Sequence, residues 1–322
     1  MKLQTQIPFQ KAANQIDYSS KLVLLGSCFS ENMGAKLHYF KFRTLQNPFG
    51  ILFHPLAIEN LISKAIQKQY YREDELFFLN ERWHCFDAHS GFSDVSKEQL
   101  LENLNTQLIK TEAQLRKSTH IIITFGTAWV YRKKESGKTV ANCHKVPQQE
   151  FVKHLLSVAE ITSSLQRTVQ EIQSINKNTQ LVFTISPVRH LKDGFIENQR
   201  SKSHLITAIH HIVNSPSLGG GWGEDYFPSY EIMMDELRDY RFYDTDMVHP
   251  NQLAIDYIWE KFVEVWVSND AKEVMKKVDE IQKGLRHRPF NTKGLEHQKF
   301  QKSLQEKIVD LQIGYPFMEF SS

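Results

Sequence analysis

The sequence predicts a doubly wound α/β fold in which helices cover both faces of a mostly parallel sheet. The first observation is a set of four short apolar runs of strand length, at residues 21–26, 120–126, 180–186 and 226–234. Their apolar residues are continuous, which is typical of strands that are covered on both sides. The second observation is that longer segments with helical spacing lie between these runs.

Three of these intervening segments carry apolar residues at helical spacing, and we expect helices over residues 54–71, 96–117 and 147–175. Residues 43–49 are expected to form a further strand or an extended loop, since Pro48 limits strand pairing there. The run NSPSLGGGWG at residues 214–223 indicates a loop because of its glycines and proline.

After Asn251 the chain is expected to be helical to its end, with a lysine-rich stretch at residues 272–288. The pattern therefore predicts one α/β domain over residues 1–265, followed by a helical C-terminal extension over residues 266–322.

Composition narrows the class of protein. The 322 residues include 39 Lys and Arg against 37 Asp and Glu, a formal net charge of +2, which favours neither nucleic acid nor an anionic membrane as partner. Three cysteines without framework spacing or a C-x-x-C pair argue against a disulfide scaffold and a zinc ribbon. The N-terminus has no apolar signal-peptide region, and no apolar run is long enough to span a bilayer. A cytoplasmic location is the resulting expectation.

The segment after the first predicted strand carries a candidate nucleophile. Gly26 allows a tight turn, and Ser27 and Cys28 then stand at the head of an expected helix. Ligands of open α/β sheets bind beyond the carboxyl ends of the strands, and a helix N-terminus offers free N–H groups to a thiolate or an oxyanion. The alternative interpretation is a buried cysteine beside a capping serine.

A candidate base lies near the end of the domain. Asp246 and His249 are three residues apart in a loop that leads into a helix. A catalytic histidine needs a partner that orients its ring, and this spacing allows both side chains to face one point. The alternative is that Asp246 caps a turn and His249 is a solvated loop residue.

The motif Gly26-Ser27-Cys28-Phe29-Ser30 resembles the signature of the GSCFA domain family, with Ser30 where the family name has alanine. That family resembles the SGNH/GDSL hydrolase superfamily. The resemblance extends over about residues 1–265, and its further motifs are the segment GTAWVY at 126–131 and Asp246/His249 with Pro250.

This resemblance implies a flavodoxin-like sheet and a hydrolase with a nucleophile, a histidine and an aspartate. Aligned on Gly26, Cys28 holds the nucleophile's place and Ser27 that of the superfamily's aspartate, while Asp246 and His249 match the triad acid and base. Gly50, in the run Asn47-Pro48-Phe49-Gly50, is the implied oxyanion donor.

The superfamily's second donor is an asparagine two residues after a glycine. Here Gly126 is followed by Thr127 and Ala128, so Thr127 or Asn142 is expected to substitute. His144 in the nearby ANCHKVP run is expected either to line the pocket or to form part of a turn.

These features predict an acyl hydrolase, an esterase or thioesterase that works through a covalent acyl-enzyme on Cys28 or Ser27. The expected substrate is a small-molecule or a glycan or lipid acyl ester, with no cofactor and no metal. One alternative is an acyltransferase with the same site, and another is a non-catalytic binding protein whose basic C-terminal helices contact a partner. A third is a metal-dependent hydrolase that uses His84, Asp87 and His144.

Overall fold

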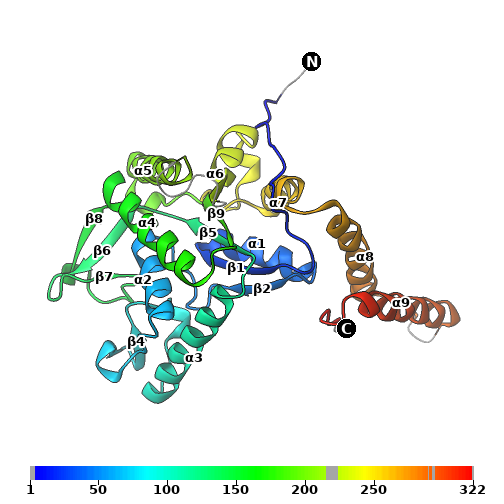
Figure 1. Ribbon diagram of the computed structural model, residues 1–322, viewed down its shortest axis with the longest axis horizontal. Helices are drawn as coiled ribbons and strands as arrows, with labels where there is room; N and C mark the ends of the chain where they lie inside the picture. Colours follow the sequence, from blue (N-terminus) through cyan, green and yellow to red (C-terminus); the bar gives the residue numbers. More distant parts are fainter. Residues whose placement is uncertain (1–3, 215–223, 289, 292–293, 321–322) are drawn as a thin grey trace.

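The central feature is a five-stranded parallel sheet, shown in the computed structural model, which describes residues 4–214, 224–288, 290–291 and 294–320 (Figure 1). The strands lie in the order β10-β9-β5-β1-β2. Their bounds are β1 Lys21–Gly26, β2 Arg43–Gln46, β5 His120–Phe125, β9 Gln180–Ile185 and β10 Glu224–Phe227. Taken in chain order this is the 2-1-3-4-5 arrangement of flavodoxin-like sheets.

Helices cover both faces of the sheet and complete three layers. One face packs against α2 (Pro55–Ile66), α3 (Lys97–Leu115), α4 (Val158–Ile175) and α5 (Phe195–Val213). The other face packs against α1 (Cys28–Tyr39) and α7 (Gln252–Trp266). Neighbouring residues of β1 alternate between the two cores, with Val23 and Leu25 in the first and Leu22 and Leu24 in the second. The continuous apolar runs of the sequence therefore reflect burial on both faces.

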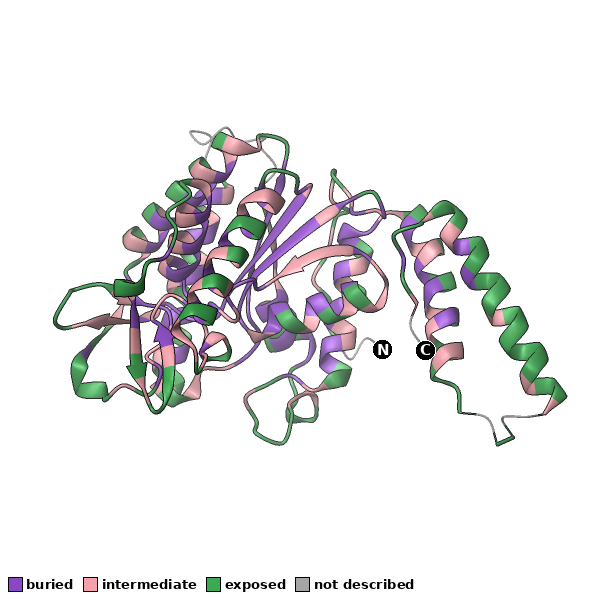
Figure 2. Ribbon diagram, turned by 90° about the horizontal axis from the view of Figure 1, so that it is seen from below, coloured by how far each residue is buried: buried purple, intermediate pink, exposed green. Residues whose placement is uncertain are grey.

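The C-terminal segment forms two helices beside the domain, α8 (Asn269–Arg286) and α9 (Leu295–Gly314) (Figure 2). The hydroxyl of Tyr39 on α1 donates a hydrogen bond of 2.8 Å to Asp279 on α8. Met275 and Val278 of α8 and Ile308 of α9 join the core that α1 and α7 share. The prediction of helices after Asn251 is confirmed as far as Gly314, whereas residues 315–320 are not helical. Within the described residues, no helix combines the length and the apolar character that a bilayer span requires.

Two small sheets were not predicted from the sequence. A hairpin of β3 (Leu76–Leu79) and β4 (Arg82–Cys85) precedes α3, and β6 (Trp129–Lys133) pairs with β7 (Thr139–Val140) and β8 (Phe151–Leu155). The helix expected from residue 147 begins only at Val158, because Ser157 and Glu160 form a capping box there. Phe151 and Leu155 are four residues apart, a spacing that fits a helix, but they lie in a strand.

The fourth predicted strand, at residues 226–234, is only partly correct. The strand β10 ends at Phe227, and the chain continues as α6 (Ser229–Glu231) and a π-helical turn (Ile232–Glu236). The loop expected at 214–223 lies outside the described residues apart from Asn214. Among the described residues, single 3-10 turns occur at η1 Glu73–Glu75, η2 Ser90–Phe92, η3 Gln148–Glu150, η4 Leu191–Asp193 and η7 Tyr240–Phe242.

Gly26 ends β1 in a conformation that admits no side chain. Its φ is +139°, and a Cβ built there would lie 2.1 Å from the backbone oxygen of Thr124. We expect Gly26→Ala to lower the free energy of unfolding by about 3 kcal/mol or more, since a backbone atom cannot move aside cheaply. Chemical denaturation of the wild type and the variant measures this difference in the free energy of unfolding.

Gly137→Ala is the matched control, because Gly137 has φ +69° but, its chain neighbours apart, no atom of the described residues within 4 Å of the added Cβ. Its cost should be only about 1 to 2 kcal/mol from the backbone conformation. Equal losses in both variants would contradict the contact with Thr124.

Candidate active site

Cys28 and Ser27 occupy different environments at the tip of β1. Ser27 is the N-cap of α1, is 1% exposed, and its Oγ accepts a hydrogen bond of 3.3 Å from the N–H of Phe29. Cys28 is the first helical residue and is partly exposed. Ser30 is buried beneath them, and its hydroxyl bonds to Thr124 Oγ1 at 3.0 Å. The hydroxyl of Ser27 thus caps the N-terminus of α1. The thiol of Cys28 does not cap the helix and is the better candidate for the nucleophile.

The thiol of Cys28 is held in its neutral form. Burial is the largest cause that raises its pKa, and the nearby carboxylate of Glu31 adds to it. Lys202 and the N–H groups of Phe29 and of Cys28 itself act in the opposite direction. Because the balance raises the pKa, a nucleophilic attack by Cys28 needs a base that takes the proton.

Asp246 and His249 form an ordered acid–base pair. Asp246 Oδ2 lies 2.6 Å from His249 Nδ1, and its Oδ1 accepts hydrogen bonds from the N–H groups of His249 and Val248 at 2.9 and 2.8 Å. The N–H of His249 is the largest cause that lowers the pKa of Asp246 to about 2. This carboxylate orients the imidazole through Nδ1, so that Nε2 is the nitrogen that can accept a proton.

The loop that carries this pair packs on the segment after β9. The N–H of Arg189 donates to the carbonyl of Val248 at 3.2 Å, and its guanidinium donates to the carbonyl of Met247. His190 is the next residue in the chain. Burial is the largest cause that lowers its pKa to about 3, and the charges of Lys202 and His249 lower it further. A Cβ built on Gly126 would lie 2.9 Å from Nε2 of His190, and Nζ of Lys202 donates to the carbonyl of the same glycine at 2.8 Å, so both side chains lie at the end of β5.

Residues from distant parts of the chain thus gather at one edge of the sheet. Cys28 follows the tip of β1, Lys202 Nζ donates to the carbonyl of the residue after β5, and the loop of His249 is bonded to the segment after β9. Within the described residues Cys28 and His249 share no direct hydrogen bond. Catalytic hydrogen bonds often tighten only when a substrate is bound.

Asn47 provides a free donor beside the tip of β1. Its Oδ1 accepts a hydrogen bond of 2.9 Å from the N–H of Gly26, which fixes the orientation of the amide. Its Nδ2 is buried and has no hydrogen-bond partner among the residues that the structure describes. An unpaired buried donor costs about 1–3 kcal/mol, and this amide is therefore a candidate donor to a bound oxyanion.

The backbone N–H groups of the other predicted oxyanion residues have partners. The N–H of Gly50 donates to the carbonyl of Asn47 at 2.7 Å and closes a turn. The N–H groups of Gly126 and Thr127 donate to the carbonyl of Phe53 at 2.7 and 3.1 Å. The hydroxyl of Thr127 bonds to Ser201 at 2.9 Å. These residues shape the loops around the site.

Asn142 and His144 belong to the loop between β7 and β8. Asn142 Oδ1 accepts a bond of 2.8 Å from the N–H of His144, and His144 Nε2 lies 2.7 Å from the carbonyl of Cys85. Burial is the largest cause that lowers the pKa of His144 to about 4. His144 thus contacts the β3–β4 hairpin, and Asn142 stabilises the turn that carries it.

The arrangement gives no support to a metal site of His84, Asp87 and His144. His84 bonds to Ser93 Oγ at 2.6 Å and to the carbonyl of Leu79 at 2.9 Å, and Asp87 pairs with Lys64 at 3.8 Å. Among the residues that the structure describes, no group of three or more His, Cys, Asp or Glu could hold a metal ion.

Sequence reasoning missed Lys202 and His190. Lys202 lies within the helical period of α5, where a lysine gives no signal of burial. His190 follows β9 in the segment SPVRH, and the rule that drew attention to Cys28, a polar residue after a strand end, applies to it equally.

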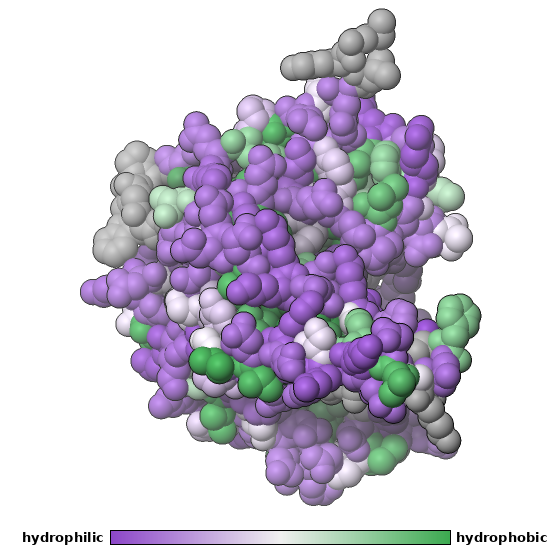
Figure 3. All heavy atoms as spheres, turned by 90° about the vertical axis from the view of Figure 1, so that its right-hand side faces the viewer, coloured by the Kyte–Doolittle hydropathy of each residue, from purple (hydrophilic) through white to green (hydrophobic). Residues whose placement is uncertain are grey.

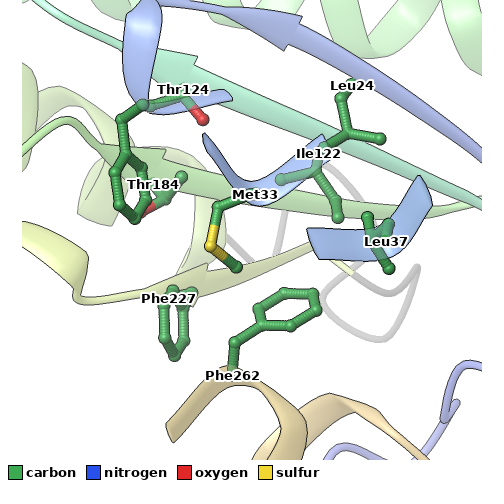
Figure 4. Close-up of a pocket in the computed structure, with 9 residues that line it drawn as sticks. Leu24, Met33, Leu37, Ile122, Thr124, Thr184, Phe227 and Phe262 are labelled. Atoms are coloured by element: carbon green, nitrogen blue, oxygen red, sulfur yellow. The ribbon is translucent and has the colours of Figure 1, made fainter. Parts of the chain in front are cut away.

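The small cavity behind α1 is too small for a substrate (Figure 4). Its volume is about 10 Å³, near the lower limit for one water molecule. It is lined by Leu24, Phe29, Met33, Leu37, Ile122, Thr124, Thr184, Phe227 and Phe262. A larger groove of about 1060 Å³ lies among α2, the β3–β4 hairpin and the β6–β7 hairpin, and Cys28 and His249 are not among its lining residues.

The C-terminal helices do not present a uniformly basic surface. Lys276, Lys283 and Lys299 each pair with an acidic residue three or four positions away, at 2.7, 2.6 and 2.9 Å. The side of the molecule that faces the viewer in Figure 3 is largely hydrophilic, with apolar side chains in separate small areas. Three lysines of these helices therefore form ion pairs within their own helix.

The fold and site define a three-layer α/β protein with a cysteine at the head of the first helix and an Asp–His pair at the same sheet edge. The chain belongs to the GSCFA family, whose model matches residues 21–262. The model of the GSCFA domain protein, C-terminal domain, matches residues 278–322. Among curated proteins, none matches this chain significantly.

Proposed function

We propose that this protein is an acyl hydrolase of the SGNH type that forms a thioester intermediate on Cys28. The observation that carries the proposal is the placement of Cys28 as the first residue of α1, on the sheet edge that also holds the hydrogen-bonded Asp246–His249 pair. The raised pKa of Cys28 supports a mechanism in which the base acts during the attack.

Acylation begins when the Sγ–H proton of Cys28 passes to Nε2 of His249 and the sulfur bonds to the acyl carbon. The carbonyl oxygen becomes an oxyanion near the N–H of Cys28 and Nδ2 of Asn47. The bond to the leaving group then breaks, and the departing alkoxide or thiolate takes the proton from His249. A thioester on Cys28 remains.

Deacylation repeats the same proton transfers with a second nucleophile. Water gives its proton to His249, attacks the thioester and releases a carboxylic acid, and the thiol of Cys28 is regenerated. If a hydroxyl compound replaces water, the product is a new ester and the protein acts as an acyltransferase. We propose a small-molecule or a glycan or lipid acyl ester as the substrate class.

Mass spectrometry of the intact protein tests the intermediate. After brief incubation with a p-nitrophenyl acyl ester, the wild-type chain should gain the mass of one acyl group, located on Cys28 and released by hydroxylamine. Cys28→Ala should gain none, because the bond-forming atom is absent.

Ser27→Ala is the matched control. It should keep the acyl adduct and lose only about 1 kcal/mol of stability, because it removes the cap of α1. An adduct on Ser27, or an adduct that survives in Cys28→Ala, would contradict the assignment of the nucleophile.

A further inference from the structure

Arg189, in the segment after β9, contacts the loop that carries His249, which we call the His249 loop (residues 244–249). The backbone N–H of Arg189 donates to the carbonyl of Val248 at 3.2 Å, and its guanidinium donates to the carbonyl of Met247. Among the described residues, both hydrogen bonds that join the His249 loop to a distant segment of the chain come from this arginine. The place of the loop at the sheet edge therefore depends on Arg189.

The His249 loop has few contacts of its own that could fix its conformation. Asp246, Met247 and His249 are exposed, so burial does little to hold them. Within the loop, the N–H of Asp244 donates to the carbonyl of His249 at 2.7 Å, and that of Met247 donates to the carbonyl of Asp244 at 2.9 Å. Met247 has a φ of +57°, a left-handed conformation that is unfavourable for a residue with a side chain. Such a conformation persists only when other contacts compensate, and the hydrogen bond from Arg189 is one of them.

Two tyrosine rings hold the guanidinium of Arg189 in this position. Its central carbon lies 4.2 Å from the ring centroid of Tyr243 and 5.6 Å from that of Tyr240, both within the range of a cation–π contact. Tyr243 directly precedes the His249 loop and forms an isolated β-bridge with Pro250, which directly follows it. The guanidinium thus contacts the base of the loop through a ring and the loop itself through a carbonyl. A planar cation with several donors can make both contacts at once.

We propose that Arg189 is a positioning residue that holds the His249 loop in the conformation in which the Asp246–His249 pair accepts a proton. This inference rests on the proposed function, because it concerns the base of that reaction. Arg189 acts through the backbone of the loop and touches no reacting atom. A general base must lie within hydrogen-bond reach of the proton that it takes, and a displacement of about 1 Å can lower a rate about 10²-fold.

Hydrogen exchange of the loop amides tests the proposal without any substrate. Peptide-resolved mass spectrometry after labelling from milliseconds to minutes reports how often the His249 loop opens, because a bonded N–H exchanges only when its hydrogen bond breaks. In Arg189→Leu, which removes the guanidinium and keeps the backbone N–H, we expect exchange in this loop to be about tenfold faster or more. Arg189→Lys keeps a charge and a donor and should lie closer to the wild type.

Arg241→Leu is the matched control, because it removes an arginine from the neighbouring 3-10 turn. The guanidinium of Arg241 bonds to Asp239 at 2.9 Å and lies 5.9 Å from the ring of Phe242, and within the described part of the chain it makes no hydrogen bond to the His249 loop. Exchange of the loop should therefore stay at the wild-type rate in this variant. Equal loop exchange in the wild type and in a folded Arg189→Leu protein would overturn the proposal.

Turnover of the p-nitrophenyl acyl ester separates positioning of the base from a general loss of structure. Arg189→Leu should lower kcat by about 10- to 10²-fold with little change in KM, since the substrate still binds but the base is less often in place. Arg189→Lys should recover most of this loss. An unchanged kcat in an Arg189→Leu protein whose loop exchanges faster would also overturn the proposal.

Tyr243→Leu covers the case in which Arg189→Leu does not fold. It removes the nearer ring beside the guanidinium, so loop exchange should rise by a smaller factor in the same direction, and an unchanged rate would overturn the proposal. The exchange rates and the acyl adduct are separate measurements. Unchanged exchange would leave acyl-enzyme formation on Cys28 intact, whereas a missing adduct together with faster exchange in Arg189→Leu would refute the proposed function and leave the anchoring of the loop in place.

Discussion

Replacement of His249 by alanine should lower kcat for the acyl ester by about 10⁴-fold, because Cys28 then has no group to take its proton. The thiol of Cys28 has a raised pKa and stays protonated at neutral pH, so the reaction depends on this transfer. Steady-state release of p-nitrophenol measures the effect. KM should change little, since His249 acts on the transition state.

Asp246→Asn should cause a loss of similar size, about 10³- to 10⁴-fold, because the amide no longer holds the required tautomer of His249. The pKa of Asp246 is lowered to about 2, first by the N–H of His249, so the carboxylate stays ionised under assay conditions. The substitution therefore removes a charge. His211→Ala, at an exposed histidine of α5, is the control and should retain full activity. Equal turnover by His249→Ala and His211→Ala would refute the acid–base pair.

Asn47→Asp should lower kcat by about 10²- to 10³-fold with little change in KM, because it removes one oxyanion donor. The variant keeps Oδ1, which accepts the hydrogen bond from Gly26, and loses the unpaired Nδ2. A stopped assay with the same acyl ester measures the loss.

The matched control for this donor is Asn142→Asp. Asn142 also uses Oδ1 to accept a backbone hydrogen bond, from His144 at 2.8 Å, but it lies in the β7–β8 loop. We expect its kcat to stay near that of the wild type. If both variants lose activity equally, the oxyanion role of Asn47 is wrong.

The fold class was predictable because strands that are buried on both faces have consecutive apolar residues in the sequence. The runs at 21–26, 120–126 and 180–186 each contain three or more consecutive apolar residues, and they form β1, β5 and β9 with ends within one residue of the prediction. The run at 226–234 misled because the π-helical turn from Ile232 is also apolar and buried. Apolar character reports burial and does not distinguish a short strand from a short helix.

The candidate residues were predictable where a reactive side chain follows a strand or lies near its partner in the sequence. Cys28 follows a strand, and Asp246 and His249 are close in sequence, so a local pattern indicated them. A local pattern could not tell the roles of Gly50 and Asn47 apart. The backbone N–H of Gly50 closes a turn, whereas the side-chain amide of Asn47 is oriented by Gly26, which is more than twenty residues away in the sequence.

The sequence by itself determined the layers of the fold, the strand tip that carries a thiol and the pairing of Asp246 with His249. Only the tertiary structure decided that the hydroxyl of Ser27 caps a helix, and that Lys202 lies buried between two strand ends. The physical reason is the distance in sequence over which each kind of interaction acts. Periodicity and turn chemistry act over a few residues, whereas burial of a charge and the choice of its partners depend on contacts between segments that meet only after folding.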